Sequence, residues 1–168
     1  MIGRVRTSTR FRRRSASGAV LIGLLFPFLL RAEPFSADGL TPAEARGKII
    51  YTAGRSPAGE PLYYRLISAG GNSFPARGTS CARCHGPHGK GGRGGDAVPP
   101  DITYGALTKA ATVSRRERVA YTDALLARAI TEGLDSSGEQ LSLLMPRWVL
   151  SGSELADLLA YLKRLGQE

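Results

Sequence analysis

The sequence predicts a small all-α domain of three to five short helices, with one segment compatible with a short β-hairpin. Three segments carry helix start and stop signals, and alternating strand patterns are nearly absent elsewhere. A chain of 168 residues is long enough for one domain with a substantial core, but it is short for two. We therefore expect one domain built around helices.

The first 32 residues have the pattern of an export signal. A basic stretch, MIGRVRTSTRFRRR, precedes the apolar run SGAVLIGLLFPFLL, which is too short to span a bilayer. Pro27 disfavours a stable spanning helix, and Ala32 offers a small residue for cleavage. We predict a signal peptide over residues 1–32, a mature domain over 33–168 and a periplasmic location. An uncleaved N-terminal membrane anchor is the alternative.

The net charge of +9 lies mostly in this leader. Residues 1–32 hold seven arginines and no acidic residue, and without them 16 basic residues face 14 acidic ones, a net charge of +2. A nucleic-acid-binding domain needs a basic patch on its folded part. We therefore expect no nucleic-acid partner, and membrane contact only if the leader stays uncleaved.

The three expected helices each begin at a Ser or Thr N-cap and end near a glycine. Two of the caps are followed three residues later by Glu, which is the pattern of a capping box. The last segment, SGSELADLLAYLKRLG, also places leucines at helical spacing. The helices should start after Thr41, Thr122 and Ser151 and end near Gly54, Gly133 and Gly166.

Two other segments lack helix signals. Within residues 52–80, only PLYYRLI resembles a strand, and GGNS resembles a turn, so a short hairpin fits there. Residues 86–100 are rich in glycine and are expected to form a loop.

The stretch CARCHGPHG contains both cysteines and both histidines of the chain, Cys81, Cys84, His85 and His88. A structural zinc site usually takes two ligand pairs from separated segments, and no second pair exists here. A thiol redox motif favours a βαβ context, which is absent. A disulfide across two residues would close a very small loop and would leave His85 unexplained. These three interpretations stay open but are weak.

Covalent haem attachment explains the spacing better, because C-x-x-C-H is its signature. Two thiols must reach two vinyl groups on one edge of a flat macrocycle, and the next residue must place its imidazole under the iron. Cys81 and Cys84 would be the thioether tethers and His85 the proximal iron ligand. We therefore predict one covalent haem c.

The second axial ligand can be narrowed by elimination. After cleavage of the leader, Met145 is the single methionine, and it lies in a loop followed by Pro146. Met and His are common axial partners, but His88 lies three residues past His85 and should stay on the same side of the haem. A buried methionine that only fills the core is the alternative.

At this point the chain resembles the class I cytochrome c family over roughly residues 41–165. The matching pieces are AEARGKIIY, CARCHG with its glycine-rich loop, PPDIT, AITEG, MPRW and SGSELADLLAYLKRL. The resemblance implies a cytochrome c-like fold around one covalent haem, with Gly47 and Tyr161 at the crossing of the first and last helices. It also implies a proline carbonyl, Pro99 or Pro100, that accepts a hydrogen bond from the proximal imidazole. Residues 52–80 depart from the family pattern as an insert before the haem motif, and we expect this insert to be a packed surface excursion.

The resemblance implies an electron carrier, not an enzyme, that exchanges single electrons with redox partner proteins. Two alternatives remain, a haem-binding subunit of a larger dehydrogenase or oxidase complex and a haem sensor or enzyme with a displaceable Met145. Candidates to hydrogen-bond the haem propionates are Arg93, Tyr104, Arg147 and Trp148.

Overall fold

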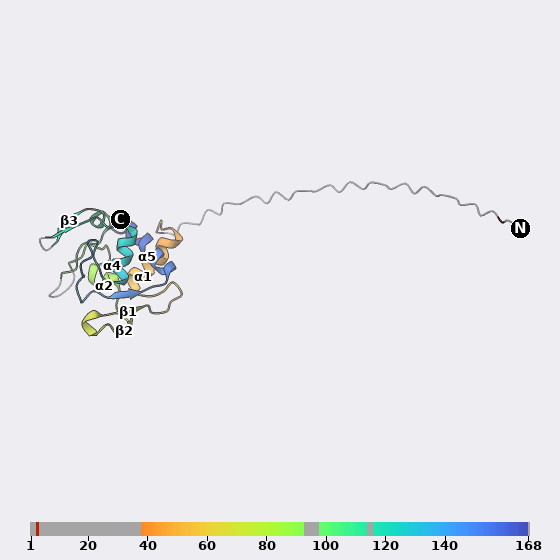
Figure 1. Cartoon of the computed structure of the whole chain (residues 1–168), viewed down its shortest axis with the longest axis horizontal. Coiled ribbons are helices and arrows are strands. Elements are labelled where there is room, and N and C mark those ends of the chain that lie inside the picture. The colour runs from red at the N-terminus through yellow and green to blue at the C-terminus, as the bar shows by residue number, and fades with distance from the viewer. Residues whose placement is uncertain (1–2, 4–37, 93–97, 114–115, 168) are drawn as a thin grey trace. The chain divides into compact units, whose positions relative to one another are not determined.

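The computed structural model describes residues 3, 38–92, 98–113 and 116–167. The predicted leader, residues 1–32, lies outside these residues apart from Gly3 and remains a prediction. Among the described residues, no helix is both long enough and apolar enough to cross a membrane. The elements, in chain order, are α1 (Pro42–Ala53), β1 (Tyr63–Arg65), η1 (Ile67–Ala69), β2 (Ser73–Pro75), α2 (Cys81–His85), α3 (Tyr104–Leu107), β3 (Ala111–Val113), β4 (Arg116–Arg118), α4 (Asp123–Thr131), β5 (Arg147–Val149) and α5 (Gly152–Arg164) (Figure 1).

The three predicted helices are confirmed as α1, α4 and α5. Thr41 and Glu44 form a capping box at the start of α1, and Ser151 and Glu154 form one at the start of α5. Thr122 caps α4 by accepting a hydrogen bond from a backbone N–H in the first turn. These caps satisfy N–H groups that no helical carbonyl can reach, which fixes where each helix begins.

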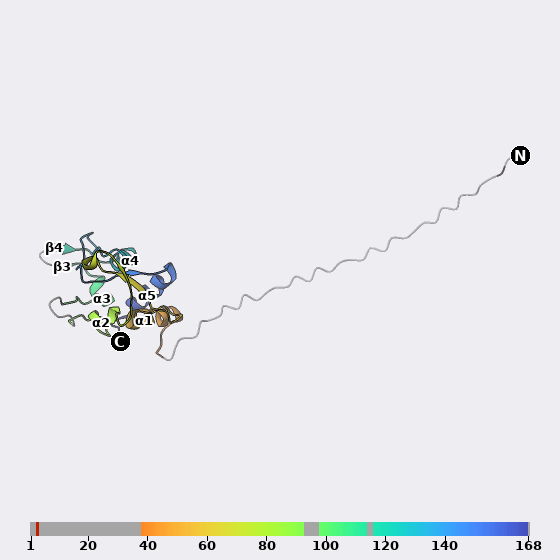
Figure 2. The same cartoon turned by 90° about the horizontal axis from the view of Figure 1, so that it is seen from below.

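Helices α1 and α5 pack against each other, as both views show (Figures 1 and 2). Gly47 lies at the contact, where a Cβ atom would overlap the backbone of Asp157 and come within 2.7 Å of the Tyr161 Cβ. The expected pairing of Gly47 with Tyr161 is therefore confirmed. A bidentate ion pair closes the same contact, with Arg46 Nε and Nη2 at 2.7 and 2.8 Å from the Asp157 carboxylate.

The predicted hairpin in residues 52–80 is present as β1 and β2, which pair antiparallel. β1 also pairs with β5, which begins two residues after Met145, and so builds a three-stranded sheet in the order β2-β1-β5. A second sheet of β3 and β4 is present as well. The fold is therefore helical at its centre, but the prediction of an all-α class missed β5 and the β3–β4 pair.

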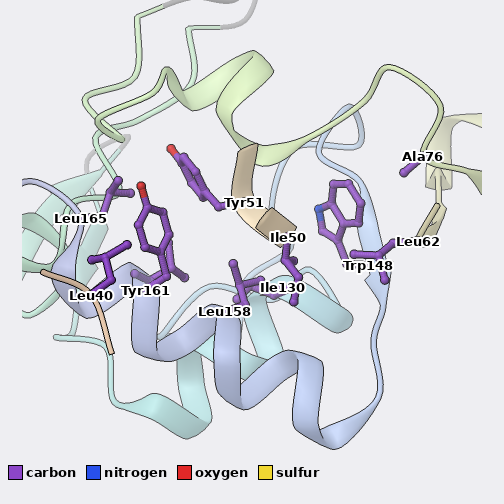
Figure 3. Packing of buried hydrophobic residues seen from close by; sticks show 11 residues of the cluster. Leu40, Ile50, Tyr51, Leu62, Ala76, Ile130, Trp148, Leu158, Tyr161 and Leu165 are labelled. Carbon is purple, nitrogen blue, oxygen red and sulfur yellow. The ribbon is translucent and has the colours of Figure 1, made fainter. Parts of the chain in front are cut away.

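Residues 52–80 also contribute to the hydrophobic core. Leu62 and Ala76, which flank the hairpin, are 5% and 2% exposed and belong to the same cluster as Ile50 and Leu158. Figure 3 shows Trp148 of β5 on the side of this cluster where Leu62 and Ala76 lie. Residues 52–80 are thus an integral part of the core packing as well as a surface excursion.

Candidate functional site

The short helix α2 carries both cysteines and His85. The Ser80 side chain accepts a hydrogen bond from Arg83 N, which starts the helix, and Gly86 ends it with φ 77° and ψ 167°. Such a backbone conformation is open mainly to glycine. Residues three and four apart on a helix lie on one face, so Cys81, Cys84 and His85 are neighbours along a single turn.

Both thiols are free, so the structure contains no disulfide between Cys81 and Cys84. Cys81 is half-buried against the core cluster, and Cys84 is exposed. Burial raises the pKa of the Cys81 thiol to about 12. Among the described residues, no group of three or more His, Cys, Asp or Glu side chains is arranged to hold a metal ion.

The His85 imidazole is oriented by one backbone carbonyl. Its Nδ1 lies 3.0 Å from the oxygen of Pro100. A proline carbonyl can only accept, so Nδ1–H donates and Nε2 keeps its lone pair. Burial lowers the pKa of His85, and the contact with Pro100 opposes this shift only in part. The neutral ring thus presents Nε2 as a ligand nitrogen.

The geometry favours Pro100 over Pro99 as the residue that orients His85. The Pro99 carbonyl accepts a hydrogen bond from Gly92 N at 3.1 Å, and Gly91 N donates to the His85 carbonyl at 2.9 Å. A Cβ atom at Gly91 would overlap the Pro99 carbonyl oxygen. The glycine-rich loop therefore folds back closely enough to bring Pro100 to the imidazole.

Tyr51 links α1 to the end of α2, a role that no motif in the sequence indicates. Its phenol is fully buried and donates a hydrogen bond to the Gly86 carbonyl at 2.7 Å. Its ring centroid lies 5.5 Å from that of Tyr161, and both rings are visible in Figure 3. The only signal in the sequence was an aromatic residue at the end of an amphipathic helix.

Met145 lies in a different part of the chain from these residues, in the loop between α4 and β5. It is half-buried, and its backbone N–H closes a turn by donating to Ser142 O at 3.0 Å. The structure thus brings His85 and Pro100 into direct contact and fixes Met145 in a separate turn. His88 is exposed, as expected for a residue outside the site.

The donor set fits a covalently bound haem. Two free thiols and an imidazole with a fixed Nδ1–H share one helical face, which is what thioether attachment and axial ligation require. Of the candidates for the propionates, Arg93 lies outside the described residues, and Trp148 is buried in the core. The Arg147 guanidinium is also buried and donates to backbone carbonyls.

One comparison with known proteins gives a match. A family model described as Cytochrome c matches residues 68–166, which is more than half of the chain and includes α2, Met145 and α5. No curated protein and no solved structure gives a significant match.

Proposed function

Because the chain belongs to the cytochrome c family, we propose that it is an exported, periplasmic electron carrier whose haem iron is bound by His85 and Met145. Membership implies a covalently attached haem c and haem-based electron transfer in general. The observation that carries the finer proposal is the 3.0 Å contact between His85 Nδ1 and the Pro100 carbonyl. This contact engages Nδ1, so Nε2 of His85, the histidine of the CxxCH motif, is the nitrogen available to bind the iron.

Each residue of the site has a defined part in this proposal. Cys81 and Cys84 tether the haem, so that it stays in place through repeated encounters with partners. Pro100 fixes the ring of His85 and increases its basicity as a ligand. The soft thioether of Met145 stabilises the ferrous state relative to a second histidine. One-electron exchange between Fe(II) and Fe(III) is the chemistry that haem c supplies when bound.

If His85 and Met145 both bind the haem iron as proposed, no coordination position would be left for a substrate. This is why we propose a carrier rather than an enzyme or a sensor. Redox partners usually dock through small, weak contacts, and the net charge of +2 after loss of the leader implies modest long-range steering.

The experiment is purification from an exporting host with cytochrome maturation. We expect a mass that corresponds to residues 33–168 plus one haem, and a reduced pyridine spectrum of a c-type haem. His85→Ala should abolish the low-spin spectrum, whereas His88→Ala, the matched control, should leave it unchanged. Met145→Ala should remove the charge-transfer band that marks Met-ligated ferric haem, and should let the ferrous protein bind carbon monoxide.

Two results would contradict the proposal. If the protein from a host with cytochrome maturation had the mass of the unmodified chain, it would carry no covalent haem. Rapid binding of carbon monoxide by the wild-type ferrous protein would favour a sensor or an enzyme with a displaceable Met145.

A second candidate function is a haem subunit of a larger dehydrogenase or oxidase complex. The observation that favours it is an apolar pair on the outer face of the three-stranded sheet. Tyr63 and Val149 are directly opposite in the β1–β5 register and are 52% and 49% exposed. A subunit would copurify with its partner, and Tyr63→Ser with Val149→Ser would release it without changing the haem spectrum.

A further inference from the structure

Arg147 is one of the most deeply buried side chains among the described residues, with 1% of its surface exposed. Its guanidinium donates to three backbone carbonyls of the preceding loop. Nη1 lies 2.7 Å from Met145 O and 3.2 Å from Ser142 O, and Nη2 lies 3.1 Å from Leu141 O. A single side chain thus forms hydrogen bonds to both ends of the segment 141–145.

The environment of this cation is unusual. A buried charge is costly unless it is paired and hydrogen-bonded. None of the ion pairs between described residues involves Arg147, and its Nε is buried without a hydrogen-bond partner among them. Backbone carbonyl dipoles carry its stabilisation, so the guanidinium and the loop depend on each other.

The end of α4 is shaped to admit this side chain. Gly133 follows α4 with φ 76°, and a Cβ atom there would overlap the Arg147 guanidinium. Gly133 O also accepts a hydrogen bond from Leu141 N at 2.8 Å, which ties the start of the loop to α4. The glycine is therefore required both by its backbone conformation and by the space that Arg147 fills.

We propose that Arg147 is a positioning residue that holds the Met145 thioether in place as an axial ligand. The inference rests on the proposed ligation by Met145. The Met145 carbonyl is bound by Arg147, and its N–H is bound by Ser142 O. With both backbone groups fixed, the origin of the side chain is fixed as well. Because both terminal nitrogens of Arg147 donate to carbonyls of this loop, the residue would act on the haem through the segment that carries Met145.

The test replaces Arg147 in the haem-loaded protein. Arg147→Met keeps the length of the side chain but loses the hydrogen-bonding fork, and Arg147→Lys keeps the charge. We measure the Met charge-transfer band as the ferric protein is warmed, and the rate of carbon monoxide binding to the ferrous protein. A hydrogen bond to a charged group is worth about a factor of ten or more, so Arg147→Met should bind carbon monoxide on the order of tenfold faster. Arg147→Lys should lie between this variant and the wild type.

Two further variants make the comparison specific. Gly133→Ala displaces the guanidinium without removing it. It should therefore change the charge-transfer band and the rate of carbon monoxide binding in the same direction as Arg147→Met does. Arg128→Met is the matched control, since Arg128 also donates to a backbone carbonyl, that of Asp135, at 2.7 Å, but not to the loop 141–145. It should keep the wild-type band and rate.

The outcomes separate the two proposals. A wild-type protein without the Met band would overturn both the ligation by Met145 and the role of Arg147. The role of Arg147 alone would be overturned if the wild type shows the Met charge-transfer band and the Arg147 variants keep both this band and the wild-type rate of carbon monoxide binding. If Arg147→Met cannot be purified with haem, the same two measurements on Arg147→Lys and Gly133→Ala test the role of Arg147. An equal change in Arg128→Met would also overturn the role of Arg147.

Discussion

Tyr51 illustrates how one hydrogen bond connects the core to the haem motif. Its phenol reaches the Gly86 carbonyl at 2.7 Å from a fully buried position. Burial raises the pKa of Tyr51 well above its usual range. The neutral phenol is therefore the form that the folded protein requires, and the residue that ends α2 depends on it for part of its hydrogen bonding.

Tyr51→Phe should lower the free energy of unfolding by about 1 kcal/mol near neutral pH, because the Gly86 carbonyl loses a buried donor. The pH dependence has a definite sign. A raised pKa in the folded state gives stability that is full below the unfolded value of about 10 and is lost as the pH rises through the folded pKa. The variant should lose less stability than the wild type between neutral and strongly alkaline pH, as measured by denaturant titration. Tyr63→Phe, which alters an exposed phenol, is the control, and an equal alkaline loss in wild type and Tyr51→Phe would contradict the argument.

At the scale of elements, the crossing of α1 and α5 sets the frame on which the site is built. The two helices approach closely because Gly47 has no side chain, and the pair between Arg46 and Asp157 fixes their rotation. Tyr51 and Tyr161 extend from this crossing, so the position of the haem motif depends on the spacing of the two helices.

Gly47→Ala should push the helices apart. The added methyl group would overlap backbone atoms of Asp157, which cannot rotate away, so we expect a destabilisation of roughly 1–3 kcal/mol. Thermal and denaturant unfolding of the haem-loaded protein would measure it. Gly152→Ala in α5 is the matched control, because nothing lies within 4 Å of a Cβ atom there, and it should be neutral or slightly stabilising. Equal stabilities of the two variants would show that the close approach does not matter.

At the scale of the whole molecule, cationic side chains gather beside the haem motif. A hollow of about 720 Å³ borders the start of α2, and its lining includes Arg55, Arg77 and Arg83 but no acidic residue. The net charge of residues 33–168 is only +2, so any steering of a partner is expected to be local. The hollow places that local charge next to the helix that carries the cysteines.

Replacing both Arg55 and Arg77 by Ser should slow the oxidation of the reduced protein by anionic ferricyanide. We expect roughly a two- to fivefold decrease at low ionic strength, because local charge raises the encounter rate with an anion. The effect should fade at high salt, where charges are screened. Stopped-flow oxidation measures it, and Lys109→Ser, an exposed residue outside the hollow, is the control. If a cationic oxidant is slowed as much as ferricyanide, the charge of the hollow is not the cause.

What the sequence predicted well was encoded locally. The caps at Thr41, Thr122 and Ser151 fix the starts of three helices within a few residues, and the hairpin turn is equally local. The haem motif was predicted for the same reason, since its residues are adjacent. The choice between Pro99 and Pro100 depends on how a glycine loop folds back, which no short window of sequence contains.

The features that were missed depend on contacts between distant residues. β5 becomes a strand because β1, more than 80 residues earlier, supplies its partner. Arg147 was named only as a candidate to hydrogen-bond a propionate, and its burial was not predicted, because arginine is rarely buried without an acidic partner. Its burial is possible because Gly133 has no side chain to occupy the space of the guanidinium. Three backbone carbonyls, which come together only in the folded chain, accept its hydrogen bonds.

The pairing of β5 with β1 has a consequence for the speed of electron exchange. The Met145 loop is anchored on one side by this sheet and on the other by the bridge between Leu134 and Gln140. If Met145 binds the iron as proposed, a change of oxidation state cannot easily move its thioether. The reorganisation energy of the centre would then be small. The β1–β2 hairpin, which supplies the partner of β5, would thus help to keep the two redox states nearly identical in shape.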